Sequence, residues 1–241
     1  NHTATHLMHA AMQQVLGAHV TQKGSLVAPD RLRFDFSHYE RVTPQQIQDI
    51  EDIVNVEIRN NTATVTELMT YDEAIDAGAL ALFGEKYGDT VRVLRFGDFS
   101  VELCGGTHVD RTGDIGAFKI TSEGGVASGV RRIEAVTGKG ALDWIDTNQQ
   151  RLDDLAGLLK TRPGLAAPRV KQLLNRNKEL EKELAAAKQA LIIGSGADLT
   201  DGIQEIAGIK VMVSRMDGTD AKTLRAAVDK FKDKLGSAIV V

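Results

Sequence analysis

The chain has 241 residues, 42% of them hydrophobic and 26% charged, a composition that indicates a globular protein and excludes a chain disordered throughout. No stretch approaches the roughly 18 consecutive apolar residues that a membrane span needs, and no secretory leader opens the chain, so we expect a cytoplasmic protein. The net charge of −4, from 29 basic and 33 acidic residues, gives no basic footprint of a nucleic-acid partner. The single cysteine, Cys104, excludes an internal disulfide.

The first 141 residues show the pattern of an α+β domain. The segment before Gly17 is apolar on almost every face and predicts a buried helix, and the alternation over 19–36 predicts an antiparallel hairpin. Thr43, Pro44 and Gln46 provide the N-cap, first-turn proline and capping box of a second helix. Further strands are expected at 63–69, 90–96, 99–104, 115–122 and 129–136, with a short helix near 71–77. Because these strands are segregated from the helices, we expect antiparallel sheet with packed helices.

Residues 142–194 predict a helical hairpin. Helical stretches at 141–160 and 169–193 are separated by a turn with prolines. In the second stretch one seam of residues recurs at steps of three and four: Val170, Leu173, Asn177, Leu180, Leu184, Ala187 and Leu191. Two antiparallel helices with this seam between them are the simplest result, although an intermolecular pair fits the seam equally well.

Residues 195–241 resemble the start of a small α/β domain. After a glycine-rich break, we expect a strand, a turn, a second strand, a helix over 219–235 and a final apolar strand. That strand ends with the chain before any turn, and the chain opens at Asn1 without an initiator methionine. We therefore expect an excised piece of a longer protein.

Two pairs of residues have the spacing of metal ligands. His2 and His6 are four residues apart, which places both imidazoles on one face of a helix. Cys104 and His108 repeat that spacing, and the two glycines between them allow a sharp turn. Three imidazoles and one thiolate suit Zn²⁺ better than Mg²⁺ or Ca²⁺. The alternative is a set of hydrogen-bonded core histidines and a buried cysteine, while His9 is a candidate replacement ligand or outer base.

Five motifs carry a resemblance to a known family. They are the sequences at 1–7, 22–25, 32–36, 102–108 and 129–135, which read NHTATHL, QKGS, LRFDF, ELCGGTH and GVRRIEA. Together they resemble the editing domain of bacterial alanyl-tRNA synthetase, including both zinc pairs in the family's order. The segments after 142 are similar, more loosely, to the coil and the start of the C-terminal domain of the same enzyme.

The resemblance implies one zinc ion per chain, bound by His2, His6, Cys104 and His108. It also implies hydrolysis of tRNA(Ala) mischarged with serine or glycine, which a site built for alanine cannot fully exclude. The aminoacylation domain, which uses ATP and alanine, should precede Asn1, so we expect no tRNA charging by this chain. Four protein ligands favour an ion that organises the site over one that activates water directly.

Four further residues are expected at the site. Thr5 lies on the same helical arc as the histidines and is a candidate contact to the substrate serine, unless its hydroxyl only bonds back to its own helix. Gln22 is the second candidate catalytic residue. Arg131 and Arg132 are candidates for binding a phosphate of the tRNA end, with strand alternation sending only one of them toward the pocket.

Three alternatives remain open at this point. A free-standing trans-editing deacylase, or the editing domain of threonyl-tRNA synthetase, would share the two zinc pairs. A non-catalytic, zinc-stabilised RNA-binding or dimerisation module would use the heptad seam as its interface. We also expect a homodimer through the C-terminal region.

Overall fold

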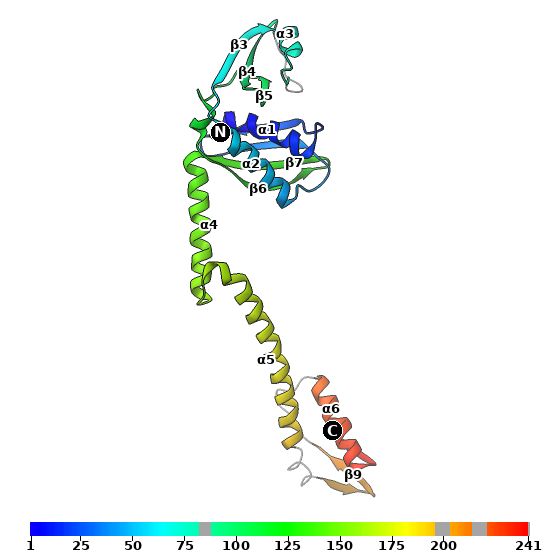
Figure 1. The fold of residues 1–241 in the computed structure, drawn as a ribbon. Coiled ribbons are helices and arrows are strands. Elements are labelled where there is room, and N and C mark those ends of the chain that lie inside the picture. The colour runs from blue at the N-terminus through cyan, green and yellow to red at the C-terminus, as the bar shows by residue number, and fades with distance from the viewer. Residues whose placement is uncertain (82–87, 196–202, 214–220, 241) are drawn as a thin grey trace. The chain divides into compact units, whose positions relative to one another are not determined.

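The computed structural model describes residues 1–81, 88–195, 203–213 and 221–240. The fold is α+β and separates into two compact units, Asn1–Arg151 and Leu152–Val241 (Figure 1). The boundary falls inside helix α4 (Gly138–Leu158). The three-part division expected from the sequence, with boundaries after 141 and 194, stays a prediction. Among the described residues no helix is both long enough and apolar enough to cross a membrane.

A four-stranded antiparallel sheet forms the base of the first unit. Its order is β1-β2-β7-β6, and the strands are β1 (Gln22–Val27), β2 (Leu32–Ser37), β6 (Phe118–Ala127) and β7 (Val130–Thr137). Phe34 and Phe36 of β2 are buried on one face, where Ile133 of β7 lies opposite Phe34. Asp35 and Arg132 lie opposite each other on the other face. One face of the sheet is therefore apolar and covered, and the other is polar.

Two helices cover the apolar face. They are α1 (His2–Leu16) and α2 (Pro44–Asn60), and both contribute side chains to one core with the sheet, including Leu7, Met8, Ile50 and Val54. The predicted capping box of α2 is confirmed, with Thr43 as N-cap and Gln46 completing it. The hairpin of β1 and β2 is confirmed as well.

A three-stranded antiparallel sheet, with order β3-β4-β5, packs beside α1. Its elements are β3 (Thr64–Thr70), β4 (Thr90–Phe96) and β5 (Ser100–Leu103), accompanied by α3 (Tyr71–Asp76) and followed by the short helix η1 (Thr112–Ile115). Strand β4 contributes side chains to two apolar clusters. Val91 and Val93 pack with Ala74 of α3, whereas Leu94 and Phe96 join the main core. Because β5 contacts α1, the loop that follows β5 lies close to that helix.

The second unit contains helices and a small mixed sheet. Its elements after α4 are η2 (Pro163–Leu165), α5 (Ala166–Ser195), β8 (Gln204–Ile206), β9 (Ile209–Met212), α6 (Ala221–Leu235) and β10 (Ala238–Val240). β9 pairs antiparallel with β8 and parallel with β10. This arrangement agrees with the small α/β domain expected from the sequence, apart from positions 219–220 of the helix and 241 of the last strand, which lie outside the described residues.

The helical hairpin expected from the heptad seam stays a prediction, and the seam itself is exposed in the described part of the chain. Along α5 the seam residues Val170, Leu173, Leu180 and Leu184 remain 42–56% exposed. Asn177 is also exposed, and its amide donates to Glu181 of the same helix. The side chain of Leu191 lies outside the described residues. The seam is regular but is not buried by the described residues, because helical spacing creates an apolar stripe without specifying what covers it.

Candidate metal centre

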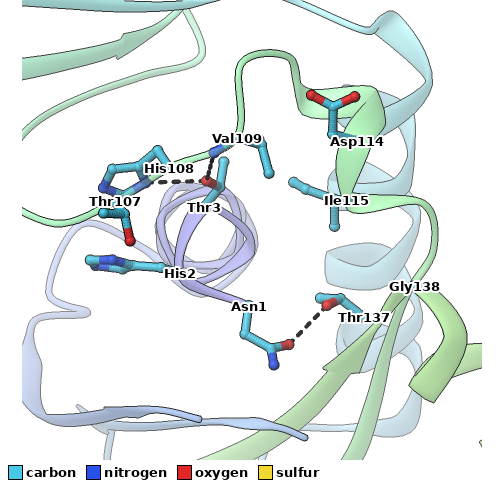
Figure 2. A pocket seen from close by; sticks show the side chains of 10 residues that line it. All are labelled: Asn1, His2, Thr3, Thr107, His108, Val109, Asp114, Ile115, Thr137 and Gly138. Carbon is cyan, nitrogen blue, oxygen red and sulfur yellow. Dashed lines mark hydrogen bonds between the residues drawn. The ribbon is translucent and has the colours of Figure 1, made fainter. Parts of the chain in front are cut away.

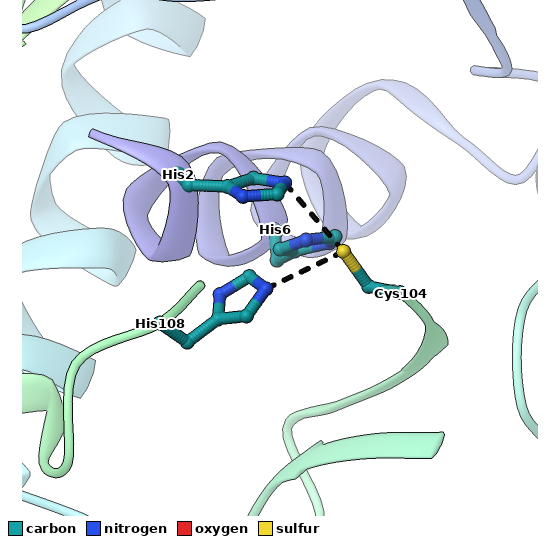
Figure 3. A group of neighbouring side chains, drawn as sticks. All are labelled: His2, His6, Cys104 and His108. Carbon is teal, nitrogen blue, oxygen red and sulfur yellow. Dashed lines mark hydrogen bonds between the residues drawn. The ribbon is translucent and has the colours of Figure 1, made fainter. Parts of the chain in front are cut away.

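Four side chains from two segments distant in sequence point toward one centre (Figure 3). His2 and His6 come from the first two turns of α1, and Cys104 and His108 come from the loop after β5. One ligating atom from each residue lies within 4.8 Å of all the others. The structure therefore brings together the four residues whose spacing indicated metal ligands.

Two distances in this group match those around a tetrahedral ion. Zn–S and Zn–N bonds of about 2.3 and 2.0–2.1 Å at tetrahedral angles imply a sulfur–nitrogen separation of about 3.5 Å. The Cys104 Sγ atom lies 3.5 Å from His2 Nε2 and 3.3 Å from His108 Nε2. His6 Nε2 is buried and has no hydrogen-bond partner among the described residues. A buried ring nitrogen without a partner, facing a thiol and two imidazoles, fits Zn²⁺ as the group these residues would hold.

The electrostatics of the group favour a thiolate. Burial raises the pKa of Cys104, but the neighbouring imidazoles of His108, His2 and His6 overcome that effect and lower the pKa from 9.0 to about 3. Burial lowers the pKa of His6, yet the nearby Cys104 thiol and the hydrogen-bonded Glu102 carboxylate raise the pKa from 6.5 to about 10. Burial is also the largest cause that lowers the pKa of His108. Metal binding to a thiolate and imidazoles competes with protons for the same atoms.

The loop from Cys104 to His108 is shaped to receive a ring. A Cβ atom at Gly106 would lie 2.1 Å from Cε1 and 2.5 Å from Nδ1 of His2. Only glycine leaves room for the imidazole there. Arg92 of β4 fixes the loop from the other side, since its Nη1 atom donates to the carbonyl oxygens of Gly105 and Gly106, at 3.2 and 2.6 Å.

The structure shows two outer contacts that the sequence analysis had not assigned. The Glu102 carboxylate accepts a 2.5 Å hydrogen bond from Nδ1 of His6, and Ser100 donates to the same carboxylate at 3.0 Å. Thr3 Oγ1 lies 3.1 Å from Nδ1 of His108. The sequence does contain one indication that Glu102 lies near the metal ligands. Glu102 precedes Cys104 by two residues in extended chain, and this spacing places both side chains on one face.

A cavity of about 360 Å³ borders this group (Figure 2). His2, Thr107 and His108 form one side of it. The remaining wall is formed by the start of the chain, the segment that leads into η1, η1 itself and the junction of β7 with α4: Asn1, Thr3, Val109, Asp114, Ile115, Thr137 and Gly138. The volume lies within the range of roughly 300–1,000 Å³ that is usual for small-molecule sites.

Three sequence candidates lie outside the group of four. Thr5 is buried, and its hydroxyl donates to the Asn1 carbonyl oxygen at 3.0 Å, which is the bond back to its own helix considered above. Gln22 is half-buried at the start of β1 and does not line the cavity. His9 donates from Nε2 to the Val20 carbonyl oxygen at 3.3 Å. His9 shares a helical face with His2, but seven residues of helix separate them by about 10 Å along the axis.

Both arginines of β7 are paired with carboxylates. Arg131 donates from Nε to Glu123, and both side chains of this pair are largely buried. Arg132 lies on the opposite face of the sheet and makes a two-bond contact with Asp35, at 2.7 and 2.8 Å. Neither arginine lines the cavity. Their role in binding tRNA phosphates stays a prediction, and a phosphate would have to compete with these pairs.

Comparisons with known proteins agree with the motifs. Residues 91–134, which run from β4 into β7, match the family described as "Threonyl and Alanyl tRNA synthetase second additional domain". The whole chain is 56% identical to part of the alanine–tRNA ligase of Stenotrophomonas maltophilia (strain K279a) and 57% identical to part of that of Nitrosococcus oceani. The identity to the alanine–tRNA ligase of Xanthomonas campestris pv. campestris (strain 8004) is 55%.

Each alignment covers all of this chain but only 27–28% of the relative. The chain thus spans little more than a quarter of the length of the relatives it matches. From its first residue to its last, the chain is similar to one segment of the bacterial alanine–tRNA ligases.

Proposed function

We propose that this chain hydrolyses the ester of tRNA(Ala) mischarged with serine or glycine, as an editing activity of an alanine–tRNA ligase. The observation that carries the proposal is the convergence of His2, His6, Cys104 and His108 beside an open cavity. The match of residues 91–134 to a domain of the threonyl and alanyl enzymes supports it, as does the high identity to alanine–tRNA ligases.

The four side chains would hold one Zn²⁺ ion, which supplies a positive charge able to organise or polarise the groups of an ester. His2 and His108 are the two ligands that also line the cavity, so a substrate entering the cavity reaches the centre from their side. The Thr107 hydroxyl stands at the same wall (Figure 2). We assign the cavity to the aminoacylated 3′ end, with His2, Thr107 and His108 as the surface it meets.

Thr5 and Gln22 remain proposed contacts to the substrate, and both require a change from the arrangement described. The Thr5 hydroxyl donates to the Asn1 carbonyl oxygen and must rotate to test a serine side chain. Gln22 lies on β1 opposite Phe36, on the face of the sheet that α1 covers. Thr5→Val and Gln22→Ala should therefore change the ratio of serine to alanine hydrolysis more than they change folding.

The direct test is a deacylation assay with Ser-tRNA(Ala), Gly-tRNA(Ala) and correctly charged Ala-tRNA(Ala). We expect release of serine and glycine in preference to alanine, and a strong loss of release in Cys104→Ser, which keeps the size of the side chain but replaces the thiolate. Chelation should abolish the activity of the unaltered chain, and added Zn²⁺ should restore it. Equal hydrolysis of all three substrates, or full activity after chelation, would contradict the proposal.

The proposed partners are tRNA(Ala) and a second copy of the chain, acting in the cytoplasm. With a net charge of −4, the chain offers little non-specific attraction to RNA. The exposed seam on α5 supports pairing with a second copy, because an apolar stripe at heptad spacing is typical of a helix with a partner helix. The alternative of a non-catalytic zinc-stabilised module predicts the same dimer but no deacylation.

A further inference from the structure

A ring nitrogen can ligate a metal only where it carries no proton, so the tautomer of each histidine matters. In His6 the two nitrogens face different surroundings. Nδ1 lies 2.5 Å from Glu102 Oε2, whereas Nε2 faces the centre without another partner among the described residues. An ionised carboxylate only accepts hydrogen bonds. The proton of a neutral His6 therefore sits on Nδ1, and Nε2 presents its lone pair to the centre.

The Glu102 carboxylate is buried and has few polar neighbours besides His6. Its side chain is 1% exposed, and its other oxygen accepts a hydrogen bond from Ser100 at 3.0 Å. Buried ionic contacts add little to stability compared with well-packed apolar residues, because the desolvation cost offsets the attraction. No Lys or Arg lies within ion-pair distance of Glu102 among the described residues. The carboxylate is thus aimed at one atom, Nδ1 of His6.

We infer that Glu102, held by Ser100, is a positioning residue that fixes the tautomer and ring orientation of His6 for metal binding. This inference rests on the proposed metal site but not on the proposed reaction. It assigns a role to the buried face of β5, where Ser100 and Glu102 alternate toward Cys104. Outer contacts of this kind typically change metal affinity by about 10–100-fold when they are removed.

The test uses the 241-residue chain with Co²⁺ as a spectroscopic probe and Zn²⁺ in competition with a chromophoric chelator. Glu102→Gln keeps the shape of the side chain but removes the charge, and its amide NH₂ group can donate to Nδ1 and so favour the wrong tautomer. We expect a loss of Zn²⁺ affinity of about 10–100-fold. The visible Co²⁺ bands should also change in intensity at saturating metal, because His6 no longer completes the ligand set. A role limited to folding would leave those bands unaltered.

Glu51 of α2 provides a matched control. It is likewise a buried glutamate, 3% exposed, and its carboxylate accepts hydrogen bonds from Ile120 N and Lys119 Nζ, away from the metal ligands. Glu51→Gln should lower the melting temperature but leave Zn²⁺ affinity and the Co²⁺ spectrum unchanged. Ser100→Ala keeps the Glu102 carboxylate but frees one oxygen, so we expect a smaller loss of affinity.

The outcomes separate the inference from the proposed function, because no tRNA is present in these measurements. Wild-type affinity and spectrum in a folded Glu102→Gln variant would overturn the inference, as would an equal loss in Glu51→Gln or a wild-type chain that binds no metal. If Glu102→Gln fails to fold, unchanged affinity in Ser100→Ala overturns it. Suppose that the variants rank in Zn²⁺ affinity as expected, with Glu102→Gln weakest and Ser100→Ala between it and the wild type. If the wild-type chain then hydrolyses no Ser-tRNA(Ala), only the proposed function is refuted.

Discussion

Replacing Gly106 by alanine should strongly weaken metal binding without unfolding the protein. The added Cβ atom would lie 2.1 Å from Cε1 of His2, whereas ordinary contacts between such atoms are 3.4–4 Å. The ring must therefore retreat by more than about 1 Å, while a metal–ligand distance tolerates a deviation of only about 0.2 Å. Because His2 lies in the first turn of α1 and is half-buried, its side chain can move at little cost to folding. We expect Zn²⁺ affinity to fall by at least about a hundredfold, as one of four ligands is lost.

The neighbouring glycine supplies the control. A Cβ atom at Gly105 meets nothing within 4 Å, and neither glycine has a positive φ angle. Gly105→Ala should therefore bind Zn²⁺ like the unaltered chain in a competition assay with a chromophoric chelator. Both metal-free variants should melt at the same temperature as the metal-free parent. If Gly106→Ala and Gly105→Ala bound Zn²⁺ equally well, the close approach of His2 to the loop would not be a feature of the metal-bound protein.

Three other predictions concern the scaffold. Thr43→Ala removes the N-cap of α2 and should lower the free energy of unfolding by about 1 kcal/mol, measured by urea denaturation. Asp35→Asn removes the carboxylate that accepts two hydrogen bonds from Arg132. That contact lowers the pKa of Asp35 below its usual 3.8. The contact therefore adds to the free energy of unfolding at neutral pH, and this stabilisation disappears as the pH falls through the lowered pKa. The variant should thus be less stable than its parent at pH 7 and equally stable in strong acid, and an equal difference at both pH values would refute the assignment. Asn177→Leu adds an apolar residue to the exposed seam of α5 and should shift the mass found by sedimentation toward a dimer, while an unchanged mass would argue against pairing through the seam.

Much of the local structure follows from local chemistry. Thr43, Pro44 and Gln46 specify the start of α2 because capping uses atoms within one turn. The alternation in β1 and β2 predicts their hairpin for the same reason. The four ligands could be paired by spacing, since four residues are one helical turn for His2 and His6 and one tight loop for Cys104 and His108.

Contacts between distant segments could not be predicted in this way. The sheet places β7 beside β2, although about a hundred residues separate Phe34 from Ile133, and no local pattern specifies that order. Glu102 meets His6 across 96 residues, so the sequence shows a motif but not the contact. The seam on α5 shows the same limit, because its period specifies an apolar stripe but not the surface that covers it.

The separation of the ligands along the chain has a consequence for the lifetime of the protein. Cys104 and His2 are 102 residues apart, and an ion held between them would close that length of chain into a ring. Unfolding would separate the two segments and release the ion, so the metal would stabilise the folded state by its binding free energy. Ligand binding stabilises in proportion to the logarithm of free ligand. The supply of metal in the cell would therefore set how often this unit opens, and how rapidly proteases remove it.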